Sequence, residues 1–193
     1  EQSKAIGFRR GEADSYKILG NAWQTKGNFD KALEYYDRAY ALAGKIHYRN
    51  ALPGILGNIG LVYFNQGNYA VALQKFYASL KAAEAVNDKL VIRSSFNNIG
   101  TIHFYQGKMK EAEDAYKKTL EISRDISDTA GMITAYNNIG EVNLEQNNAT
   151  KALSNLSIAF QLASSKNVPD LLVAVTNTIG DSYLRLDSLQ KAA

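Results

Sequence analysis

The sequence predicts an all-α fold, in which antiparallel helix pairs stack side by side into an α-α superhelix, or solenoid. Three columns of residues predict it. Glycines recur every 40 residues, at Gly20, Gly60, Gly100, Gly140 and Gly180. An alanine follows each of these phase glycines by twelve residues, at Ala32, Ala72, Ala112, Ala152 and Ala192. Large side chains lie sixteen residues after the first four, at Tyr36, Phe76, Tyr116 and Leu156. Such a period is typical of stacked helical hairpins.

The first helix of each unit, helix A, contains the phase glycine. The residues one position before it are apolar, those four positions before it are large and apolar or aromatic except Thr176, and those three positions after it are mostly aromatic. All three columns share one face of a helix. Glycine inside a helix costs about 1 kcal/mol relative to alanine, so a glycine in every unit predicts close approach of a neighbouring helix.

A turn and a second helix, helix B, follow each helix A. Seven residues after the phase glycines stand residues suited to a left-handed helix end, at Gly27, Gly67, Gly107, Asn147 and Asp187. The alanine column and the large side chains then lie on helix B, where they face helix A.

In chain order, we expect one continuous array over residues 1–193, with about five units of which the terminal ones are incomplete. Residues 1–10 are expected to be the tail of a preceding helix B. Complete repeats are expected near 12–50, 51–90, 91–130 and 131–170. Residues 171–193 would hold an incomplete fifth repeat with a turn near Asp187. Because both ends fall inside the repeat, we expect a fragment of a longer protein.

Composition narrows the chemistry of the chain. A content of 46% hydrophobic residues excludes disorder, and the absence of cysteine excludes disulfide scaffolds and thiolate sites. Only His47 and His103 are present, which is too few for a histidine metal cluster. A net charge of +3 does not by itself indicate a nucleic-acid partner. We therefore expect no catalytic residues, no metal, no cofactor and no nucleic acid.

The face of helix A opposite its packing stripe holds the candidate binding residues, because helices A line the inner, concave surface of stacked hairpins. An asparagine ladder stands two positions before the phase glycine, at Asn58, Asn98 and Asn138. Beside it, three positions before the glycine, are Asn97, Asn137 and Asn177. Further candidates on this face are Phe64, Phe104, Tyr105, Thr101, Glu141 and Arg185.

Asparagine is a poor residue in the middle of a helix, so its recurrence needs a reason. Its carboxamide both donates and accepts hydrogen bonds, which suits the backbone of an extended peptide. The alternative is that these asparagines bond to neighbouring helices or connecting loops. For Phe64 and Phe104, the alternative is burial against the next helix A. The carboxylates of this face outnumber its cations, which favours a neutral or mildly basic peptide with apolar side chains over an acidic one.

The order of leucine or isoleucine, glycine, aromatic, glycine, aromatic, alanine and aromatic residues resembles the tetratricopeptide repeat (TPR) pattern, from about Gly11 to Ala193. Segments such as Asn97-Asn98-Ile99-Gly100 look most like the long-repeat branch, which includes kinesin light chain, spindle-orientation adaptors and arrays in bacterial signalling proteins. This resemblance implies a non-enzymatic scaffold that binds an extended peptide segment in its concave groove, as part of a larger signalling or regulatory protein. It also implies that Asn58, Asn98 and Asn138 hold the ligand main chain.

Two other functions remain as alternatives, namely a receptor for a short signalling peptide and a module that self-associates through uncapped ends. No apolar run approaches the roughly 18 residues of a membrane span, so we expect no direct membrane contact from this chain. The sequence names no compartment. The cytoplasm is the default, and the alternative is the extracytoplasmic sensor portion of a membrane-anchored protein.

Overall fold

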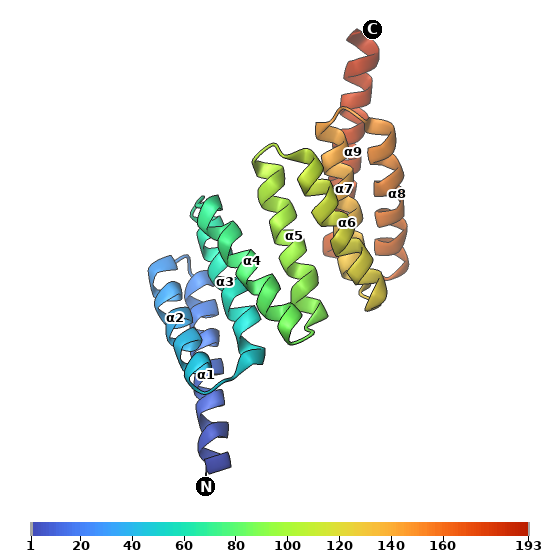
Figure 1. Cartoon of the computed structure of the whole chain (residues 1–193). Helices are drawn as coiled ribbons and strands as arrows, with labels where there is room; N and C mark the ends of the chain where they lie inside the picture. The colour runs from blue at the N-terminus through green and yellow to red at the C-terminus, as the bar shows by residue number, and fades with distance from the viewer. Residues whose placement is uncertain (1, 193) are drawn as a thin grey trace. The chain divides into compact units, whose positions relative to one another are not determined.

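The structure is a computed structural model that describes residues 2–192, with side chains over 7–185 and at Asp187. The described residues form α-helices and one 3-10 helix, joined by short turns (Figure 1). Their bounds are α1 (Gln2–Thr25), α2 (Phe29–Lys45), η1 (Arg49–Ala51), α3 (Leu52–Asn65), α4 (Tyr69–Ala85), α5 (Lys89–Tyr105), α6 (Met109–Asp125), α7 (Thr129–Glu145), α8 (Ala149–Ser165) and α9 (Pro169–Ala192). The all-α fold predicted from the sequence is confirmed.

The chain divides into two compact units, Glu1–Ser95 and Phe96–Ala193, with the division inside α5. In the first unit, α1 pairs with α2 and α3 with α4, while η1 leads into α3. In the second unit, α7 pairs with α8, α6 packs on α7, and α9 packs on both α7 and α8. The odd-numbered helices are the predicted helices A and the even-numbered ones the predicted helices B.

The phase glycines make room for the large side chain of helix B. A Cβ at Gly60 would lie 2.6 Å from Cε1 of Phe76, and one at Gly100 would lie 2.7 Å from Cε1 of Tyr116. The same contact joins Gly140 to Leu156 at 2.8 Å, and Gly20 to Tyr36. Non-bonded carbon atoms essentially never come this close, so a Cβ would not fit at these glycines. The predicted close approach of a neighbouring helix is confirmed.

The turns after helix A contain a left-handed residue as predicted, with φ of 74° at Gly27, Gly67 and Gly107 and 57° at Asn147. A second left-handed column lies in the connections from helix B to the next helix A. It consists of non-glycine residues with φ between 52° and 56°, at His47, Asn87, Ser127 and Asn167. The members of this column differ in residue type, so the repeat spacing did not predict it.

Both outer helices differ from the expected pattern. Helix α1 is continuous from Gln2, so residues 2–10 belong to the first helix A and are not a separate tail of a helix B. Glycines at 7 and 11 do not interrupt it, since one glycine costs a helix only about 1 kcal/mol. Helix α9 continues to Ala192 through the expected turn at Asp187. In the complete repeats this turn is held by packing of helix B onto the phase glycine, and no atom of the described residues lies within 4 Å of a Cβ built at Gly180.

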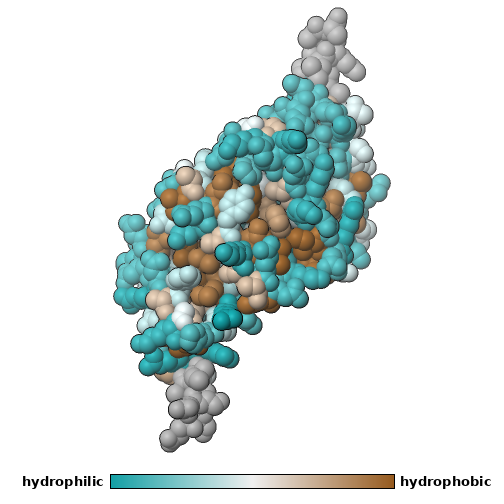
Figure 2. Space-filling view, in the orientation of Figure 1, coloured by the Kyte–Doolittle hydropathy of each residue, from teal (hydrophilic) through white to brown (hydrophobic). Residues whose placement is uncertain are grey.

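The core of each unit runs along its helix pairs. Tyr36 and Ile55 in the first unit, and Ile133 and Leu156 in the second, are fully buried. The alanine column is also fully buried at Ala32, Ala72, Ala112 and Ala152. Patches of apolar residues interrupt the hydrophilic surface on the face that Figure 2 shows.

Candidate functional site

In the first unit, a polar network joins helix A of one repeat to helix A of the next. Asn58 on α3 donates from Nδ2 to Oδ1 of Asn21 on α1 at 2.8 Å. The hydroxyl of Tyr36 lies 2.8 Å from the same Asn21 oxygen and 2.6 Å from Oε1 of Gln24, and these two amide oxygens share its single proton. Burial raises the pKa of Tyr36 to about 12, so this hydroxyl keeps its proton at neutral pH.

A related network forms in the second unit. Asn138 on α7 donates from Nδ2 to Oδ1 of Asn97 on α5 at 3.0 Å. The hydroxyl of Tyr116 on α6 donates to Oγ1 of Thr101 at 3.3 Å, and the Thr101 hydroxyl donates to the backbone carbonyl oxygen of Asn97 at 3.0 Å. Two asparagines of the predicted ladder, Asn58 and Asn138, therefore bond to a neighbouring helix A through their amide nitrogen. Oδ1 of Asn138 accepts no hydrogen bond from the described residues.

The remaining asparagines differ in burial. Asn98 is half-buried and Asn177 is exposed, and neither side chain forms a hydrogen bond with another described residue. Asn137 is only 9% exposed and donates from Nδ2 to Oε1 of Glu141 at 2.8 Å. Asn137 thus lies below the surface, where it positions a carboxylate.

Three helices A of the second unit enclose a pocket of about 200 Å³. Phe104 reaches it from α5 and Glu141 from α7, while Arg185 reaches it from α9. These three residues belong to the candidate set predicted from the sequence. The pocket is completed by Leu144, Glu145, Thr178 and Asp181.

The electrostatics of this pocket centre on Glu141. Burial raises the pKa of its carboxyl group, and the nearby carboxylates of Asp181 and Glu145 raise it further, whereas the hydrogen bond from Asn137 lowers it. Arg185 donates to the Leu144 carbonyl oxygen at 2.9 Å and to Oε1 of Glu145 at 2.6 Å. Three carboxylates thus face one guanidinium beside the apolar side chains of Phe104 and Leu144.

The aromatic candidates have separate positions. Phe104 is half-buried against the core of the second unit, with its ring 6.1 Å from that of Tyr105 in an edge-to-face arrangement. Tyr105 is 61% exposed. In the first unit, Phe64 is half-buried and its ring lies 5.6 Å from that of Tyr69. Both phenylalanine side chains are thus partly buried, and burial of Phe64 against the next helix A stays a prediction.

The candidate set omitted several residues that the structure places in these networks. Asn21 and Asp181 follow their phase glycines by one position, Gln24 and Leu144 by four, and Thr178 precedes its glycine by two. The signal that could have identified them is their position, because these columns lie on the same face of helix A as the predicted residues. These columns hold different residue types in different repeats, such as Gln24 and Leu144 at the same position, so no single residue type marked them as candidates.

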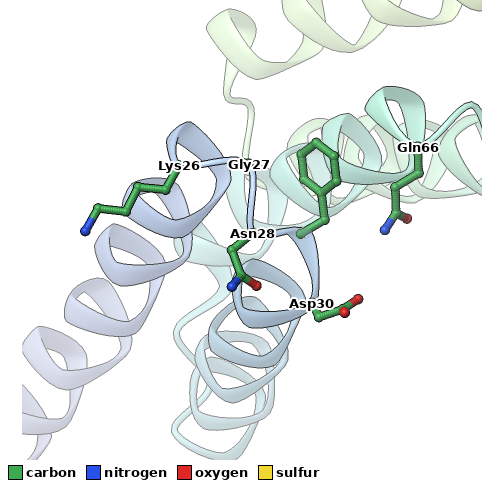
Figure 3. A pocket seen from close by; sticks show the side chains of 6 residues that line it. Lys26, Gly27, Asn28, Asp30 and Gln66 are labelled. Atoms are coloured by element: carbon green, nitrogen blue, oxygen red, sulfur yellow. The ribbon is translucent and has the colours of Figure 1, made fainter.

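Another pocket, of about 510 Å³, lies at the turn between α1 and α2 (Figure 3). Lys26, Asn28 and Asp30 surround it, with Gln66 from the end of α3. Their side chains point in different directions and do not converge on a common point (Figure 3). This pocket is therefore a weaker candidate than the smaller one on α5, α7 and α9.

Comparison with protein families decides which family the chain represents. Models described as tetratricopeptide repeat match residues 13–46 and 52–125, which together make up more than half of the sequence. The chain belongs to the tetratricopeptide repeat family. TPR units stack into solenoids whose extended surfaces serve binding. Assignment to the long-repeat branch stays a prediction.

Solved structures share this TPR fold at low sequence identity. BtubC (BKLC) from P. vanneervenii has a TM-score of 0.80 at 21% identity, over 98% of this chain and 83% of that one. Aspartyl phosphate phosphatase F from Bacillus subtilis has a TM-score of 0.84 at 14% identity, over 93% and 49%. A signal transduction ATPase with numerous domains (STAND) and a tetratricopeptide repeat sensor, from Pyrococcus horikoshii, has a TM-score of 0.81 at 15% identity, over 91% and 28%. The TPR chain thus spans about half or less of the last two proteins.

No curated protein matches the TPR chain by sequence. Among the described residues, no group of three or more histidine, cysteine, aspartate or glutamate side chains is arranged to hold a metal ion. No helix in the described part of the chain combines the length and apolar character needed to cross a membrane.

Proposed function

We propose that this TPR chain is a non-catalytic interaction module that binds an extended peptide segment of a partner protein on the helix-A face of its repeats. One observation carries the proposal. Phe104, Glu141 and Arg185, which the repeat spacing alone assigned to this face, line one pocket on α5, α7 and α9. Residues about 40 positions apart thus meet at a concave site, where ligands generally bind.

Asparagine amides beside the pocket support recognition of peptide main chain. The Asn98 side chain has no hydrogen-bond partner among the described residues, and Asn138 keeps its carbonyl oxygen as an acceptor. Each amide can pair with a backbone group whatever side chain that residue carries. A network that already holds Asn97 and Asn138 in place reduces the entropy lost on binding.

Charge in the pocket favours a basic or neutral side chain in the bound segment. Glu141, Glu145 and Asp181 outnumber Arg185, and Arg185 already pairs with Glu145. An acidic side chain would meet like charges, whereas the aliphatic stem of a lysine or arginine would pack on Phe104 and Leu144. One structural neighbour, the Bacillus subtilis protein, is named as a phosphatase, and that name concerns the neighbour alone. For this chain we propose no catalytic activity.

The test is a selection of random peptides displayed on phage against the purified chain, followed by affinity measurement on synthetic versions. Replacing Asn98 and Asn138 together by alanine should weaken binding at least tenfold, because each lost hydrogen bond contributes about 1 kcal/mol. The control replaces Gln74 and Gln161, two exposed amide side chains on helices B, by alanine and should leave affinity unchanged.

The melting temperature separates binding from a structural role. We expect the double asparagine variant to keep its helicity and to melt close to the parent chain. Early unfolding of that variant, or unchanged peptide affinity, would contradict the proposal. Truncation of the selected peptides then tests the alternative of a receptor for a short signalling peptide, which would retain full affinity for a free peptide of a few residues.

A further inference from the structure

The connection between α2 and α3 forms a pocket that the proposed peptide site does not use. Its volume is about 250 Å³, and it is lined by Arg10 of α1 and by residues 47–50. These residues all belong to the first compact unit, whereas the pocket of Phe104, Glu141 and Arg185 belongs to the second. The two sites therefore share no residue.

Two arginines give this pocket a positive charge. Arg10 and Arg49 both line it, and no described aspartate or glutamate does. Neither guanidinium group forms a hydrogen bond or an ion pair with another residue of the described chain. A guanidinium group carries five N–H donors in a planar fork that matches the oxygens of an anion. The donors of both arginines are thus available to an external anion.

Tyr48 positions one of these arginines. The Cζ atom of Arg10 lies 5.2 Å from the centre of the Tyr48 ring, which is within the range of a cation–π contact. The Tyr48 hydroxyl donates to Oδ2 of Asp14 at 3.3 Å. Asp14 also forms an ion pair with Lys17 at 3.5 Å, so this carboxylate already has partners of its own. A guanidinium group held in place before binding loses less entropy when an anion arrives.

The same connection contains a carboxylate in the next two repeats. Asp88 and Asp128 stand 40 and 80 residues after Tyr48. They accept hydrogen bonds from the backbone N–H groups of Val91 at 3.1 Å and Gly131 at 3.0 Å, respectively. The Tyr48 side chain makes no such bond to the helix that follows it. The first connection therefore lacks the negative charge that its two successors carry.

A phosphate group matches this set of donors better than a carboxylate does. At neutral pH a phosphate monoester carries a charge of about −1.5 to −2, which balances two arginines. Its oxygens can accept paired N–H bonds from each guanidinium group. The ring of His47 and the amide of Asn50 also line the pocket and add further N–H donors. A carboxylate has a single charge and two oxygens, so it would leave one arginine unbalanced.

We propose that this pocket binds a phosphate group, either on a phosphorylated serine side chain of a partner protein or as free inorganic phosphate. Arg10 and Arg49 bind its oxygens from two sides, with Arg10 positioned by the ring of Tyr48. The site lies in the first unit and does not involve Asn98, Asn138 or the pocket of the second unit. This proposal and the proposed peptide binding can therefore fail separately.

Proton–nitrogen NMR spectra of the chain test the site. The probes are inorganic phosphate, N-acetyl-O-phosphoserine methylamide and acetate, each added at constant ionic strength because salt screens exposed charges. Both phosphates should shift the backbone amides of residues 47–50 to saturation, and acetate should bind about tenfold more weakly or less well still. Tighter binding of the phosphoserine derivative than of inorganic phosphate identifies a protein side chain as the ligand, and the reverse order identifies the free ion.

Arg10→Gln and Arg49→Gln should each raise the phosphate dissociation constant about tenfold or more, because each removes charge-assisted hydrogen bonds. Arg38→Gln is the matched control, since it changes the net charge equally but lies in an exposed ion pair with Glu34 on α2. It should leave the dissociation constant unchanged.

Circular dichroism melts establish that the variants are folded. Arg49→Gln decides the outcome if Arg10→Gln unfolds, because the Arg49 side chain has no hydrogen bond or ion pair within the described chain to lose. The proposal is overturned if phosphate leaves the amides of residues 47–50 unshifted or if acetate binds as tightly as phosphate. It is also overturned if the folded variants bind like the parent chain, or if all three arginine variants lose affinity equally, since net charge alone would then explain the binding.

Discussion

At the scale of single residues, the phase glycines are fixed by the ring or branched side chain that packs on them. Phe76 is only 1% exposed, so its ring has no free space into which it can move away from a Cβ at Gly60. The repeated glycine is therefore a packing requirement of the helix pair.

We expect Gly60→Ala to lower the free energy of unfolding by about 1 to 2 kcal/mol, because overpacking costs more than the gain in helix propensity. Urea denaturation followed by circular dichroism measures it. Gly44→Ala is the control, since nothing lies within 4 Å of a Cβ at that helical glycine, and it should stabilise the chain by up to about 1 kcal/mol. Equal effects at both sites would contradict this account.

Glu141 is a residue at which charge and burial conflict. Folding raises the pKa of its carboxyl group, so the native state binds the proton more tightly than the unfolded state. The charged form therefore costs stability above that pKa, and the cost disappears as the pH falls through it.

Glu141→Gln should accordingly raise the free energy of unfolding at pH 7, and its advantage over the parent chain should shrink as the pH falls toward 4. Urea denaturation at both pH values measures the difference. Glu121→Gln is the control, since Glu121 forms an exposed ion pair with Lys118 and should change stability by less than about 1 kcal/mol. A stability loss in Glu141→Gln at pH 7 would show that the carboxylate is paired favourably.

At the scale of elements, left-handed residues separate every helix from the next among the complete repeats. Those after helices A are mostly glycine, and those after helices B are not. A non-glycine residue pays about 1 kcal/mol for this conformation, so the connections after helices B hold strain that glycine would remove.

The two turns that flank α6 test this directly. Ser127 has φ of 56°, so Ser127→Gly should raise the free energy of unfolding by about 1 kcal/mol. Gly107 has φ of 74°, and Gly107→Ser should lower it by a similar amount. Thermal melts of the two variants should shift in opposite directions, and shifts of the same sign would argue against a backbone origin.

At the scale of the whole molecule, stability is distributed along the repeats. Each helix pair has its own buried glycine contact and alanine contact, and the described core residues form separate clusters in the two units. Repeat arrays of this kind behave as sums of unit stabilities and nearest-neighbour terms.

Amide hydrogen exchange should therefore report damage locally. We expect Gly60→Ala to accelerate exchange mainly in α3 and α4, and Gly140→Ala to accelerate it mainly in α7 and α8. Mass spectrometry of peptic fragments measures both. A uniform acceleration across all helices in either variant would mean that the chain opens as one cooperative body.

The sequence by itself determined the repeat period, the helix pairs, the left-handed turns after helices A and the reason for the phase glycines. These features depend on residues a few positions apart, and a helix repeats its faces every 3.6 residues, so spacing encodes them directly. The positions of Phe104, Glu141 and Arg185 on a common face followed from the same periodicity.

Only the tertiary structure decided how those positions are used. It buries Asn137 beneath Glu141, ties Asn138 to Asn97, leaves the Asn98 amide unbonded and closes a pocket with Thr178 and Asp181. It also continues α9 to Ala192 through the predicted turn. These outcomes depend on whether helices that lie about 40 residues apart in the sequence contact one another. The distance between two such helices is set by side-chain packing. The periodicity of each helix carries no information about that distance.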